Sequence, residues 1–589
     1  MTNMMKENSK KKKAVIQPAG NADRDETPSM EKETKKEPRS AAVKIIPLGG
    51  LDRIGMNCTV FEYGNDMIVV DAGIAFPQDD MPGVEVIIPD FTYLEDNADK
   101  VRGLILTHGH EDHIGAVPYL LKRVPCDVYG TRLTLGIVEG KLEEHDLDPN
   151  MLFEVQAGEV LTLGAFEVEF IHVNHSMPDS VALCIQTPCG RIIMTGDFKI
   201  DYTPIGTTPI DLARFAELGR KGVKLLMADS TNVERPGFTP SESTLTTSFD
   251  RIFNETSKRI VISTFASNVH RVQQILDASE KWGRKVAVTG RSMENVMSAA
   301  EELGYLHIPD GLLVDIADAK YFLPEELTIL TTGTQGEPLS ALYRMAFGSH
   351  SFVSLGENDL VILSSSCIPG NERFVNRIIN ELYRRNVTVI TDRTDDVHVS
   401  GHACREELKL IHSLVQAENF IPVHGEYRHL AQHARLASAL GMPSSHILIP
   451  EAGHTVLLDK KGIRFGDLVE AGHIMIDAGK GNGVESAVLT ERRKMAETGI
   501  VVVTCCIDLE REMVFEPDLV TKGFILEKEN EDLLAFLKER AVHCVLKWLG
   551  KGIDDEPTMN ARLKEDIGNA IFERTKRKPV IVAHAVYIP

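Results

Sequence analysis

Short apolar runs alternate with polar positions along the first half of the chain, and glycines separate them. Alternation with a period of two residues is typical of half-buried strands, and glycine between two such runs favours a turn. This pattern predicts a strand-rich α/β region. The strands are expected at 43–47, 57–63, 67–71, 166–172, 191–195 and 225–228.

Between about residues 236 and 396 the pattern changes to strand, helix, strand, helix. A strand expected at 259–264 leads into a helical stretch at 268–281, and a strand at 285–289 leads into another at 292–303. The cycle returns at 360–364, 372–385 and 387–391. Such alternation predicts a parallel, doubly wound sheet with helices on both faces.

After residue 458, a stretch containing Gly472, Gly479, Gly481 and Gly483 precedes a final unit. Its strands are expected at 499–505 and 579–586, on either side of an amphipathic helix at 531–549 that Gly550 would end. We expect the apolar stripe of this helix to face a core, and a dimer contact is the alternative. Residues 478–483 resemble a phosphate-binding loop but lack the flanking strand and helix, so we assign them no such role. The stripe consists of Leu533, Leu537, Ala541, Val545 and Trp548.

The composition indicates a multidomain protein of the cytoplasm. A chain of 589 residues is too long for one core, and no apolar run approaches the roughly 20 residues that span a membrane. The N-terminal lysines are not followed by an apolar segment, so we expect neither a signal peptide nor a membrane partner. Nine cysteines without C-x-x-C spacing fit reduced thiols in the core or near the surface.

The charge argues against indiscriminate binding of nucleic acids. The net charge is −22, and residues 1–40 hold ten basic and seven acidic side chains, which leaves −25 for the rest of the chain. So acidic a body repels a polyanion at long range, and a nucleic acid would need a local basic groove and metal ions. Residues 1–40 have almost no aliphatic periodicity and are expected to be a disordered tail. Lys10–Lys13 could tether RNA or a ribosome, but a solvated tail is the default interpretation.

The run His108-Gly109-His110-Glu111-Asp112-His113 is the strongest chemical signal. It follows the apolar stretch 103–107, which is typical of a buried strand, and precedes a helix-compatible stretch. In extended backbone His108 and His110 point to the same side and can share one ion, while Asp112 and His113 leave in another direction and suit a second. Mixed imidazole and carboxylate ligands fit zinc best, and manganese is an alternative. A histidine-rich polar turn is the competing interpretation.

Three further candidates follow predicted strands. His175 comes after the strand at 166–172, Asp197 after the apolar residues 192–194, and His424 after Phe420-Ile421. A lone histidine is more often structural than a ligand, but their shared place at strand ends favours a common site. His172 lies within a strand alternation, and we interpret it as structural.

In this order, Asp71, the 108–113 motif, His175, Asp197 and His424 resemble the five motifs of the metallo-β-lactamase superfamily. Further segments resemble its β-CASP branch and, within that, the ribonuclease J family. The resemblance runs from about Pro47 to the C-terminal end. The additional segments are Asp229-Ser230-Thr231-Asn232, Arg235–Thr239, Gly290–Met293, Thr332–Glu337, His398–His402, Lys522-Gly523-Phe524 and Arg577-Lys578-Pro579.

The resemblance implies a metallo-β-lactamase αββα sandwich, an inserted doubly wound α/β β-CASP domain and a small α+β C-terminal domain. Asp197 and His424 are 227 residues apart, which leaves room for an inserted domain. The expected divisions are a Lys-rich tail (1–40), a first metallo-β-lactamase segment (41–232), the β-CASP domain (233–396), a second metallo-β-lactamase segment (397–458), and a linker with the C-terminal domain (459–589).

The resemblance also implies the roles of the site residues. Two zinc ions would each take three ligands of their own, Asp197 would bridge them, and the pair would acidify a water for in-line attack on phosphorus. Asp71 would orient a ligand imidazole, although an Asp that closes a turn before Ala72-Gly73 is as good an interpretation. One ion would be held by His108, His110 and His175, and the other by Asp112, His113 and His424.

The segment His398–His402 carries groups that a phosphodiester substrate needs. Ser400 and His398 can donate to phosphate oxygens, Gly401 permits close backbone approach, and Val399 belongs to the same segment. His402 could protonate the leaving oxygen, with Asp229 positioning it as the related motif implies. A polar turn at a domain junction is the alternative. Arg291 and Ser292, at a predicted strand-to-helix turn, are further candidates for phosphate recognition.

His424 resembles the RNA-processing β-CASP enzymes, so we expect RNA as the substrate. The resemblance implies 5′-to-3′ exonuclease activity on 5′-monophosphate ends, some endonuclease activity, and work in mRNA decay and rRNA maturation. It further implies a homodimer or homotetramer and an association with an RNA-degradation complex or the ribosome.

Two other functions fit some features of the sequence. A small-molecule metallohydrolase of the glyoxalase II or lactonase type would share every metal ligand but needs neither the inserted domain nor residues 398–402. A structural RNA-binding or scaffold subunit would not need the complete set of ligands.

Overall fold

The computed structural model describes residues 42–78, 80–335, 340–367, 371–477, 483–511 and 513–588. They form two compact units. The first contains the residues up to Phe76 and Ile87–His473, and the second contains Pro77–Val86 and Ile474–Pro589. The tail expected at 1–40 lies outside the described residues, as do 478–482 of the glycine-rich segment.

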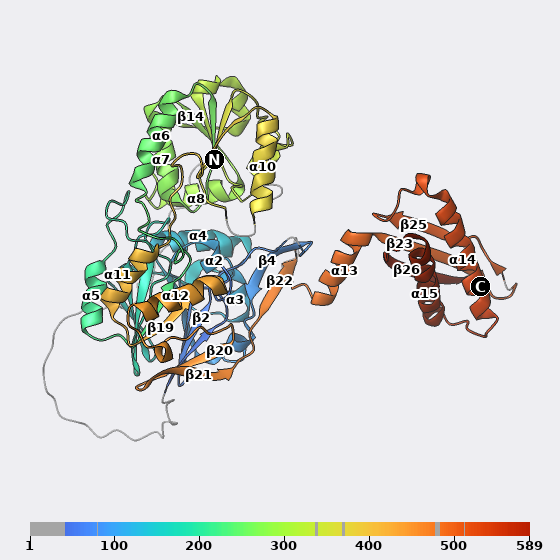
Figure 1. Ribbon diagram of the computed structural model, residues 1–589, viewed down its shortest axis with the longest axis horizontal. Helices are drawn as coiled ribbons and strands as arrows, with labels where there is room; N and C mark the ends of the chain where they lie inside the picture. Colours follow the sequence, from blue (N-terminus) through green and yellow to red (C-terminus); the bar gives the residue numbers. More distant parts are fainter. Residues whose placement is uncertain are drawn as a thin grey trace. The chain divides into compact units, whose positions relative to one another are not determined.

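Two mixed sheets form the base of the first unit (Figure 1). One contains β1 (Val43–Pro47), β2 (Thr59–Tyr63), β3 (Asp66–Val70), β5 (Val101–Ile105), β6 (Val128–Gly130), β7 (Leu152–Glu154), β20 (His454–Asp459) and β21 (Gly462–Leu468), in the order β21-β20-β1-β2-β3-β5-β6-β7. The other contains β8 (Val160–Leu163), β9 (Phe166–His172), β10 (Val181–Thr187), β11 (Gly190–Met194), β12 (Leu225–Asp229) and β19 (Asn419–Val423), in the order β19-β12-β11-β10-β9-β8. β4 (Val84–Pro89) pairs with β22 (His473–Asp477).

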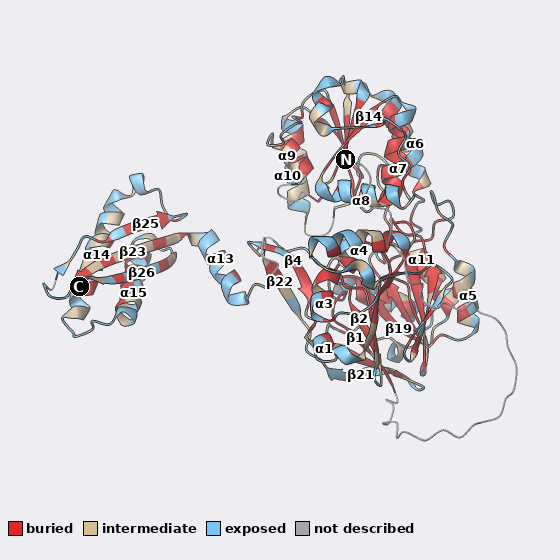
Figure 2. Cartoon of the chain, turned by 180° about the vertical axis from the view of Figure 1, so that it is seen from behind, coloured by how far each residue is buried: buried red, intermediate tan, exposed pale blue. Residues whose placement is uncertain are grey.

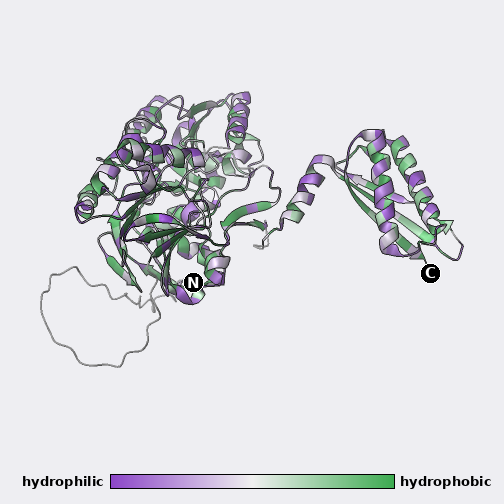
Figure 3. Cartoon of the chain, turned by 60° about the horizontal axis from the view of Figure 1, so that its bottom comes forward, coloured by the Kyte–Doolittle hydropathy of each residue, from purple (hydrophilic) through white to green (hydrophobic). Residues whose placement is uncertain are grey.

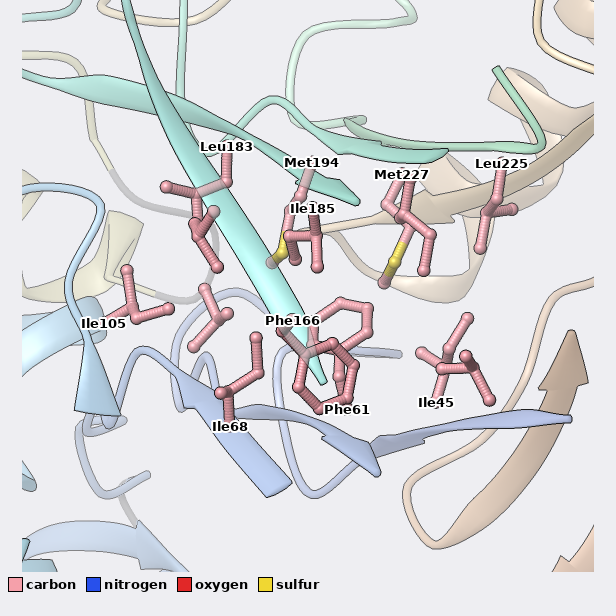
Figure 4. Packing of buried hydrophobic residues seen from close by; sticks show 14 of the residues in the cluster. Ile45, Phe61, Ile68, Ile105, Phe166, Leu183, Ile185, Met194, Leu225 and Met227 are labelled. Carbon is pink, nitrogen blue, oxygen red and sulfur yellow. The ribbon is translucent and has the colours of Figure 1, made fainter. Parts of the chain in front are cut away.

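The two sheets pack face to face through apolar side chains. Phe61 and Ile68 from one sheet point toward Leu183 and Met194 from the other (Figure 4). These residues are buried, and each such side chain contributes roughly 1.5–3 kcal/mol through the water that it excludes. Because alternate residues of a strand point to opposite faces, each sheet also presents an outer face that must be covered.

Helices cover the outer face of the second sheet. Phe215, Leu408 and Ala437 come from three different helices and pack with Leu226 and Phe420 of the sheet. α4 contacts β6 and β7 of the first sheet. Figure 2 shows buried positions on the strands and exposed positions on the helices of this αββα sandwich. The helices are α1 (Thr92–Glu95), α2 (Glu111–Ile114), α3 (Val117–Arg123), α4 (Arg132–Glu144), α5 (Leu212–Arg220), α11 (Arg405–Val415) and α12 (Tyr427–Ala439).

A doubly wound α/β domain is inserted between β12 and β19. Its six strands have the order β15-β14-β16-β13-β17-β18, and all their pairings are parallel. α6, α7 and α8 cover one face, and α9 and α10 cover the other. The elements are β13 (Arg259–Ser263), β14 (Lys285–Thr289), β15 (Leu313–Val314), β16 (Leu327–Thr331), β17 (Asp359–Leu363), β18 (Thr388–Thr391), α6 (Ser243–Glu255), α7 (Val269–Lys281), α8 (Arg291–Glu302), α9 (Ala341–Ala346) and α10 (Glu372–Arg384).

The second unit packs two long helices on one face of a small mixed sheet. Val501, Val503 and Cys505 of β23 form its core with side chains such as Leu537 and Leu563 from the helices. Figure 3 shows hydrophobic and hydrophilic positions alternating along these helices, as expected for helices with one buried face. The elements are α13 (Ser486–Thr498), β23 (Ile500–Asp508), β24 (Met513–Val514), β25 (Asp518–Lys522), α14 (Glu531–Leu549), α15 (Glu556–Thr575) and β26 (Val580–Ile588).

The predicted fold class is confirmed: an αββα sandwich, an inserted doubly wound α/β domain and a small α+β domain. The stripe on α14 is a core face, since Leu537, Ala541 and Val545 are fully buried. Six of the nine cysteines are buried and three are partly exposed. In the portion of the chain that the structure describes, no helix combines the length and apolarity needed to cross a bilayer.

Candidate metal centre

The 108–113 motif lies where β5 ends and α2 begins. β5 ends at Ile105, His108 is fully buried in the loop, and His110 is the residue that precedes α2. Gly73 lies beneath α2, where a Cβ atom would come within 1.6 Å of the Asp112 carbonyl oxygen. The start of α2 can therefore pack this closely against the backbone of residue 73 only because that residue has no side chain.

The structure brings the seven predicted metal ligands together around one carboxylate oxygen. Asp197 Oδ2 lies 3.3 Å from Nε2 of His113 and 3.4 Å from Nε2 of His424. It also lies 3.7 Å from Nε2 of His108 and 3.9 Å from Nε2 of His175. Segments that are far apart in the sequence thus meet in one cleft, and Asp197 stands at its centre.

Among the described residues, three candidate sets of metal-binding donor atoms share Asp197: one joins it to Asp229, His402 and His424, and the other two consist of predicted ligands alone. Of these two sets, one is His108, His110, His175 and Asp197, and the other is Asp112, His113, Asp197 and His424. The donor atoms of each set lie within 4.8 Å of one another. His110 Nδ1 is 3.1 Å from His108 Nε2 and 3.0 Å from His175 Nε2. Ligand atoms about 2.0–2.1 Å from a tetrahedral zinc are about 3.3 Å apart, so the first set fits one such ion.

Each of three histidines uses its other ring nitrogen in a hydrogen bond away from the centre. His113 Nδ1 lies 2.7 Å from Asp71 Oδ2, and His175 Nδ1 lies 2.7 Å from the Gly401 carbonyl oxygen. His108 Nδ1 lies 3.1 Å from Thr107 Oγ1. These contacts leave the Nε2 atoms facing Asp197, which is the tautomer that a metal ion needs.

Asp71 contacts this histidine cluster from a strand end of the first sheet. Its backbone has a φ of 61°, in the left-handed region, and it is fully buried. Its Oδ1 accepts from the Thr107 amide at 2.8 Å, and its Oδ2 accepts from the Thr107 hydroxyl at 2.9 Å as well as from His113. The contacts are those that the predicted orienting role requires, and the role itself stays a prediction.

The protonation of the cluster suits cation binding. Burial holds the pKa of His108 and of His175 well below its usual range and lowers the pKa of His110 to about 4, so these rings are neutral at neutral pH. Burial acts the same way on His113, but the surrounding carboxylates, led by Asp197, raise its pKa well above its usual range. The proton on His113 balances the negative charge of Asp197, which a divalent cation would balance in its place. The other rings are already neutral, and neutral imidazole is the form that binds metal.

Asn57 is a member of the centre that the sequence analysis missed. Its Nδ2 lies 3.0 Å from His113 Nε2, and its Oδ1 lies 3.1 Å from His424 Nδ1. It also donates to the Asp112 carbonyl oxygen at 3.0 Å. One amide side chain thus contacts all three residues of the second set other than the shared Asp197. A single Asn just before a strand carries no pattern that sequence reasoning could have used.

His402 lies beside the cluster, held by Asp229 as expected from the resemblance. His402 Nδ1 is 2.8 Å from Asp229 Oδ2, and Asp229 Oδ1 accepts from the Thr231 amide at 2.9 Å. Burial alone would lower the pKa of His402, but Asp229 raises it to about 9, so the ring is protonated at neutral pH. A protonated imidazole beside a cation site can donate a proton to a leaving oxygen.

The rest of the 398–402 segment is tied to the inserted domain. Arg271 of α7 is fully buried and donates from Nη1 to His398 Nδ1 at 2.8 Å and from Nη2 to the Val399 carbonyl at 3.2 Å. Burial lowers the pKa of His398 well below its usual range, and its Nδ1 is the accepting nitrogen, so Nε2 carries the proton. The Val399 side chain belongs to the hydrophobic core of the inserted domain rather than to an open surface.

Ser400 and Gly401 shape the turn itself. Ser400 Oγ accepts from Asn232 Nδ2 at 2.8 Å and from the His402 amide at 3.2 Å. A Cβ on Gly401 would come within 2.6 Å of the His175 ring. The close approach that this glycine permits is therefore to a candidate ligand histidine. His172, interpreted as structural, contacts the Thr208 carbonyl at 2.9 Å and belongs to none of the candidate metal sets of the described residues.

Arg291 and Ser292 are exposed and form the first two positions of α8. They follow Gly290, which ends the turn after β14 with a φ of 118°. This is the carboxyl edge of the parallel sheet, where ligands bind in doubly wound folds. Their role in phosphate recognition stays a prediction.

Four family models match successive segments of the chain. The metallo-β-lactamase superfamily matches residues 52–261, and the ribonuclease J β-CASP domain matches 257–382. The Zn-dependent metallo-hydrolase RNA specificity domain matches 387–450, and the ribonuclease J C-terminal domain matches 487–588.

Curated relatives match over almost the full chain. Ribonuclease J of Helicobacter pylori (strain ATCC 700392 / 26695) is 40% identical over 92% of this chain and 80% of its own length. Ribonuclease J of Thermus thermophilus is 42% identical over 92% and 94%. Ribonuclease J2 of Bacillus subtilis is 37% identical over 93% and 99%. Among solved structures, a protein of unknown function from Enterococcus faecalis V583 shares the fold, with a TM-score of 0.52 and 18% identity over 71% of this chain and 100% of that one.

Proposed function

This chain belongs to the ribonuclease J family and is a metal-dependent RNA hydrolase, and we propose that it holds two zinc ions and degrades RNA from the 5′ end. The observation that supports the two-ion proposal most directly is the position of Asp197. One of its oxygens lies within 3.9 Å of ring nitrogens from both donor sets. A shared carboxylate between two sets of imidazoles is the arrangement of a bridged pair of cations.

The two donor sets define the binding residues. His108, His110 and His175 would hold one ion, Asp112, His113 and His424 the other, and Asp197 both. The mixture of nitrogen and carboxylate donors favours zinc, and manganese is the alternative. When bound, such a pair would acidify a water for attack on phosphorus and stabilise negative charge on the phosphate oxygens.

The protein supplies proton transfer and orientation. His402 is the proton donor to the leaving 3′ oxygen, since its Nδ1 is engaged by Asp229 and its Nε2 remains for the substrate. His398 Nε2 donates to a phosphate oxygen, because Arg271 occupies its Nδ1. Ser400 and Gly401 act through the shape of the turn, and the Val399 carbonyl ties that turn to Arg271.

RNA enters with its 5′ end first in this proposal, and a 5′-monophosphate is bound near the carboxyl edge of the inserted sheet. Arg291 and Ser292, exposed at the start of α8, are the proposed contacts to that phosphate. The activity is 5′-to-3′ exonucleolytic with an additional endonuclease activity. In the cell the protein would act in the cytoplasm on mRNA decay and rRNA maturation, as a homodimer or homotetramer, alone or with an RNA-degradation complex or the ribosome.

The test combines metal analysis with an end-dependent decay assay. We expect about two zinc ions per chain and stepwise release of nucleotides from 5′-monophosphorylated RNA labelled at its 3′ end. Asp197→Asn should lose metal and activity together. His402→Gln should keep its metal and lose roughly 10²–10⁴-fold in kcat, the usual contribution of a general acid.

Two outcomes would contradict the proposal. Shortening of the RNA from its 3′ end would exclude the assigned polarity, and a single ion in the fully active enzyme would exclude the bridged pair. Thioester and lactone substrates run in parallel should not be hydrolysed.

A further inference from the structure

Five basic residues gather at one end of the sheet in the second unit, and we call this surface the basic end. It is unusual because the chain as a whole carries a charge of −22. Each of the five side chains belongs to an exposed residue. The basic end consists of Lys522, Arg574, Lys576, Arg577 and Lys578.

The topology of the sheet brings these residues together. Lys522 ends β25 and Val580 begins β26, and both strands flank β23, where Ile500 pairs with Lys522 on one side and with Val580 on the other. The segment before β26 therefore emerges beside the end of β25. Arg577 Nη1 fixes the contact by donating to the Phe524 carbonyl oxygen at 3.2 Å.

A tight crossing supports the same end of the sheet. A Cβ on Gly499 would lie 2.4 Å from the Gly523 carbonyl carbon, and Gly499 has a φ of 78°. Thr498 Oγ1 donates to the Lys578 carbonyl oxygen at 3.1 Å. The backbone that carries the basic side chains is thus anchored, while the five residues themselves are exposed.

The charges of the basic end are not neutralised by ion pairs. Elsewhere in the second unit basic side chains pair with carboxylates, as Arg540 does with Asp566 at 2.8 Å and Lys538 with Glu516 at 2.7 Å. Within the described ranges of the chain, no carboxylate lies within 4.0 Å of a charged nitrogen of the five residues. Glu527, five residues after Lys522, accepts from the Thr521 amide at 3.0 Å, and the charge of Lys522 helps to lower its pKa without an ion-pair contact.

Aromatic rings lie among these cations. Phe572 is 40% exposed, with Lys576 Nζ 5.4 Å and Lys578 Nζ 4.9 Å from its ring centre. The Arg574 guanidinium lies 3.8 Å from the ring centre of Phe536. Proteins that bind single-stranded nucleic acid combine unpaired cations for the phosphates with exposed rings on which bases stack.

We propose that the basic end is a second RNA-binding site, which takes the phosphates of single-stranded RNA on Lys522, Lys576 and Lys578 and a base on Phe572. The proposal rests on the action of the protein on RNA. Because the rest of the chain repels a polyanion, a local cluster of unpaired cations is needed to hold RNA that extends beyond the catalytic centre. An acidic protein partner is the competing occupant.

The experiment compares two double variants of the full-length, metal-loaded protein. Lys576→Gln with Lys578→Gln removes two charges from the basic end. Lys551→Gln with Lys564→Gln removes two exposed charges elsewhere on the same unit. Binding of phosphorothioate-linked RNA of about 40 nucleotides, which resists hydrolysis, is measured by fluorescence anisotropy at several salt concentrations. Hydrolysis of an RNA of about 5 nucleotides, near the lower limit of single-strand site sizes, is measured for each variant.

The Lys576/Lys578 variant should bind the long RNA about tenfold more weakly. The slope of the logarithm of its binding constant against the logarithm of the salt concentration should become shallower by about 1.4, which corresponds to two lost phosphate contacts on a single strand. Phe572→Ala should weaken binding without changing the slope, because stacking releases no counterions. The Lys551/Lys564 variant should behave as the wild type, and the short RNA should be cleaved at the wild-type rate by all of them.

Wild-type affinity and slope in the Lys576/Lys578 variant would overturn the proposal and would favour an acidic protein as the occupant. An equal loss in the Lys551/Lys564 variant would overturn it as well, since the effect would then be one of net charge. Failure of the wild type to cleave the short RNA would instead count against the proposed catalytic centre, which keeps the two conclusions separate.

Discussion

Single hydrogen bonds decide which atom of each ligand histidine faces the centre. Thr107 Oγ1 donates to Asp71 Oδ2 at 2.9 Å and can accept from His108 Nδ1 at 3.1 Å, and Asp71 accepts from His113 Nδ1 in the same way. One buried carboxylate therefore contacts two rings that belong to different donor sets, His113 directly and His108 through Thr107. The loss of this carboxylate should disturb both sets at once.

Asp71→Asn should lower zinc affinity about 10–100-fold, the usual effect of removing such an orienting group, because an amide offers only one acceptor oxygen for the three donors that the carboxylate accepts. Competition with a chromogenic chelator measures the affinity. Asp99→Asn, at an exposed position, serves as the control and should change nothing. Unchanged affinity in Asp71→Asn would leave this residue as a turn-closing Asp.

Gly401→Ala should reduce metal content and activity, because its Cβ would come within 2.6 Å of the His175 ring and push that ligand out of position. Gly140→Ala on α4, where a Cβ would meet nothing within 4 Å, should be neutral or slightly stabilising by up to about 1 kcal/mol. Metal analysis and thermal unfolding of both variants test the pair. A fully metal-loaded Gly401→Ala would show that the contact is easily relieved.

Among helices and strands, those with a continuous pattern were predicted with accurate bounds. β1, β9, β14 and α14 begin and end at the expected residues, because their period is uninterrupted and turn residues flank them. α15 was missed, although its buried Met559, Leu563 and Ile567 recur at helical spacing, so the signal was present. β25 was missed because its polarity does not follow its burial: Thr521 is buried, whereas Val520 is exposed.

A glycine after a helix does not by itself show which residue adopts the left-handed conformation, as the end of α14 illustrates. Gly550 follows the last helical residue, as expected, but its φ of −62° is right-handed. The left-handed residue is Gly552, with a φ of 77°.

The candidate ligands were found because they follow strands, whereas Asn57 and Arg271 act through contacts that only the folded chain creates.

α7 is linked to the 398–402 segment through Arg271, and Arg271→Met should break this link. Glu242, 2.9 Å from Nη2 of Arg271, would keep only Lys199, at 3.7 Å, as a cationic partner, so stability should fall by at most about 3–5 kcal/mol. His398 would lose its fixed tautomer, so kcat/KM on RNA should fall while metal content stays constant. Urea unfolding, kinetics and metal analysis measure these effects.

The double variant Arg271→Met with Glu242→Gln separates the two roles of this arginine. It also removes the buried charge of Glu242 and should recover some of the stability but none of the activity. Recovery of activity together with stability would mean that Arg271 acts only through folding.

α11 and α12 bury two histidines against each other, which makes stability depend on pH. His412 Nε2 lies 3.2 Å from His433 Nε2. Burial lowers the pKa of His412 to about 4 and that of His433 well below its usual range. The unfolded chain binds protons near pH 6.5 and the folded chain does not, so each group lowers stability by about 1.4 kcal/mol per pH unit as the pH falls from 6.5 toward the folded pKa.

Urea midpoints measured at pH 7.5 and pH 5 should therefore differ less in His433→Leu than in the wild type. Comparing each protein with itself removes the difference in baseline stability. An equal fall in both proteins would assign the acid sensitivity to other groups.

Across the full chain, charge is distributed unevenly. The first 40 residues carry a balance of +3 against −25 for the rest. A segment with so little apolar periodicity is expected to act as a solvated tail. Deletion of residues 1–40 should leave the affinity for RNA and the melting temperature of the protein unchanged, and a loss of affinity in anisotropy titrations would assign RNA tethering to Lys10–Lys13.

The insertion between Asp197 and His424 has a consequence for synthesis of the protein. At roughly 5–20 residues per second, the 227 residues between them take between roughly 11 and 45 seconds to translate. Throughout that interval the nascent chain has the first donor set but lacks the last imidazole of the second, and until residue 398 is reached it also lacks the whole 398–402 segment. The nuclease is thus inactive during this part of its synthesis, and ribosome-stalled chains that end before and after His424 would show when cleavage begins.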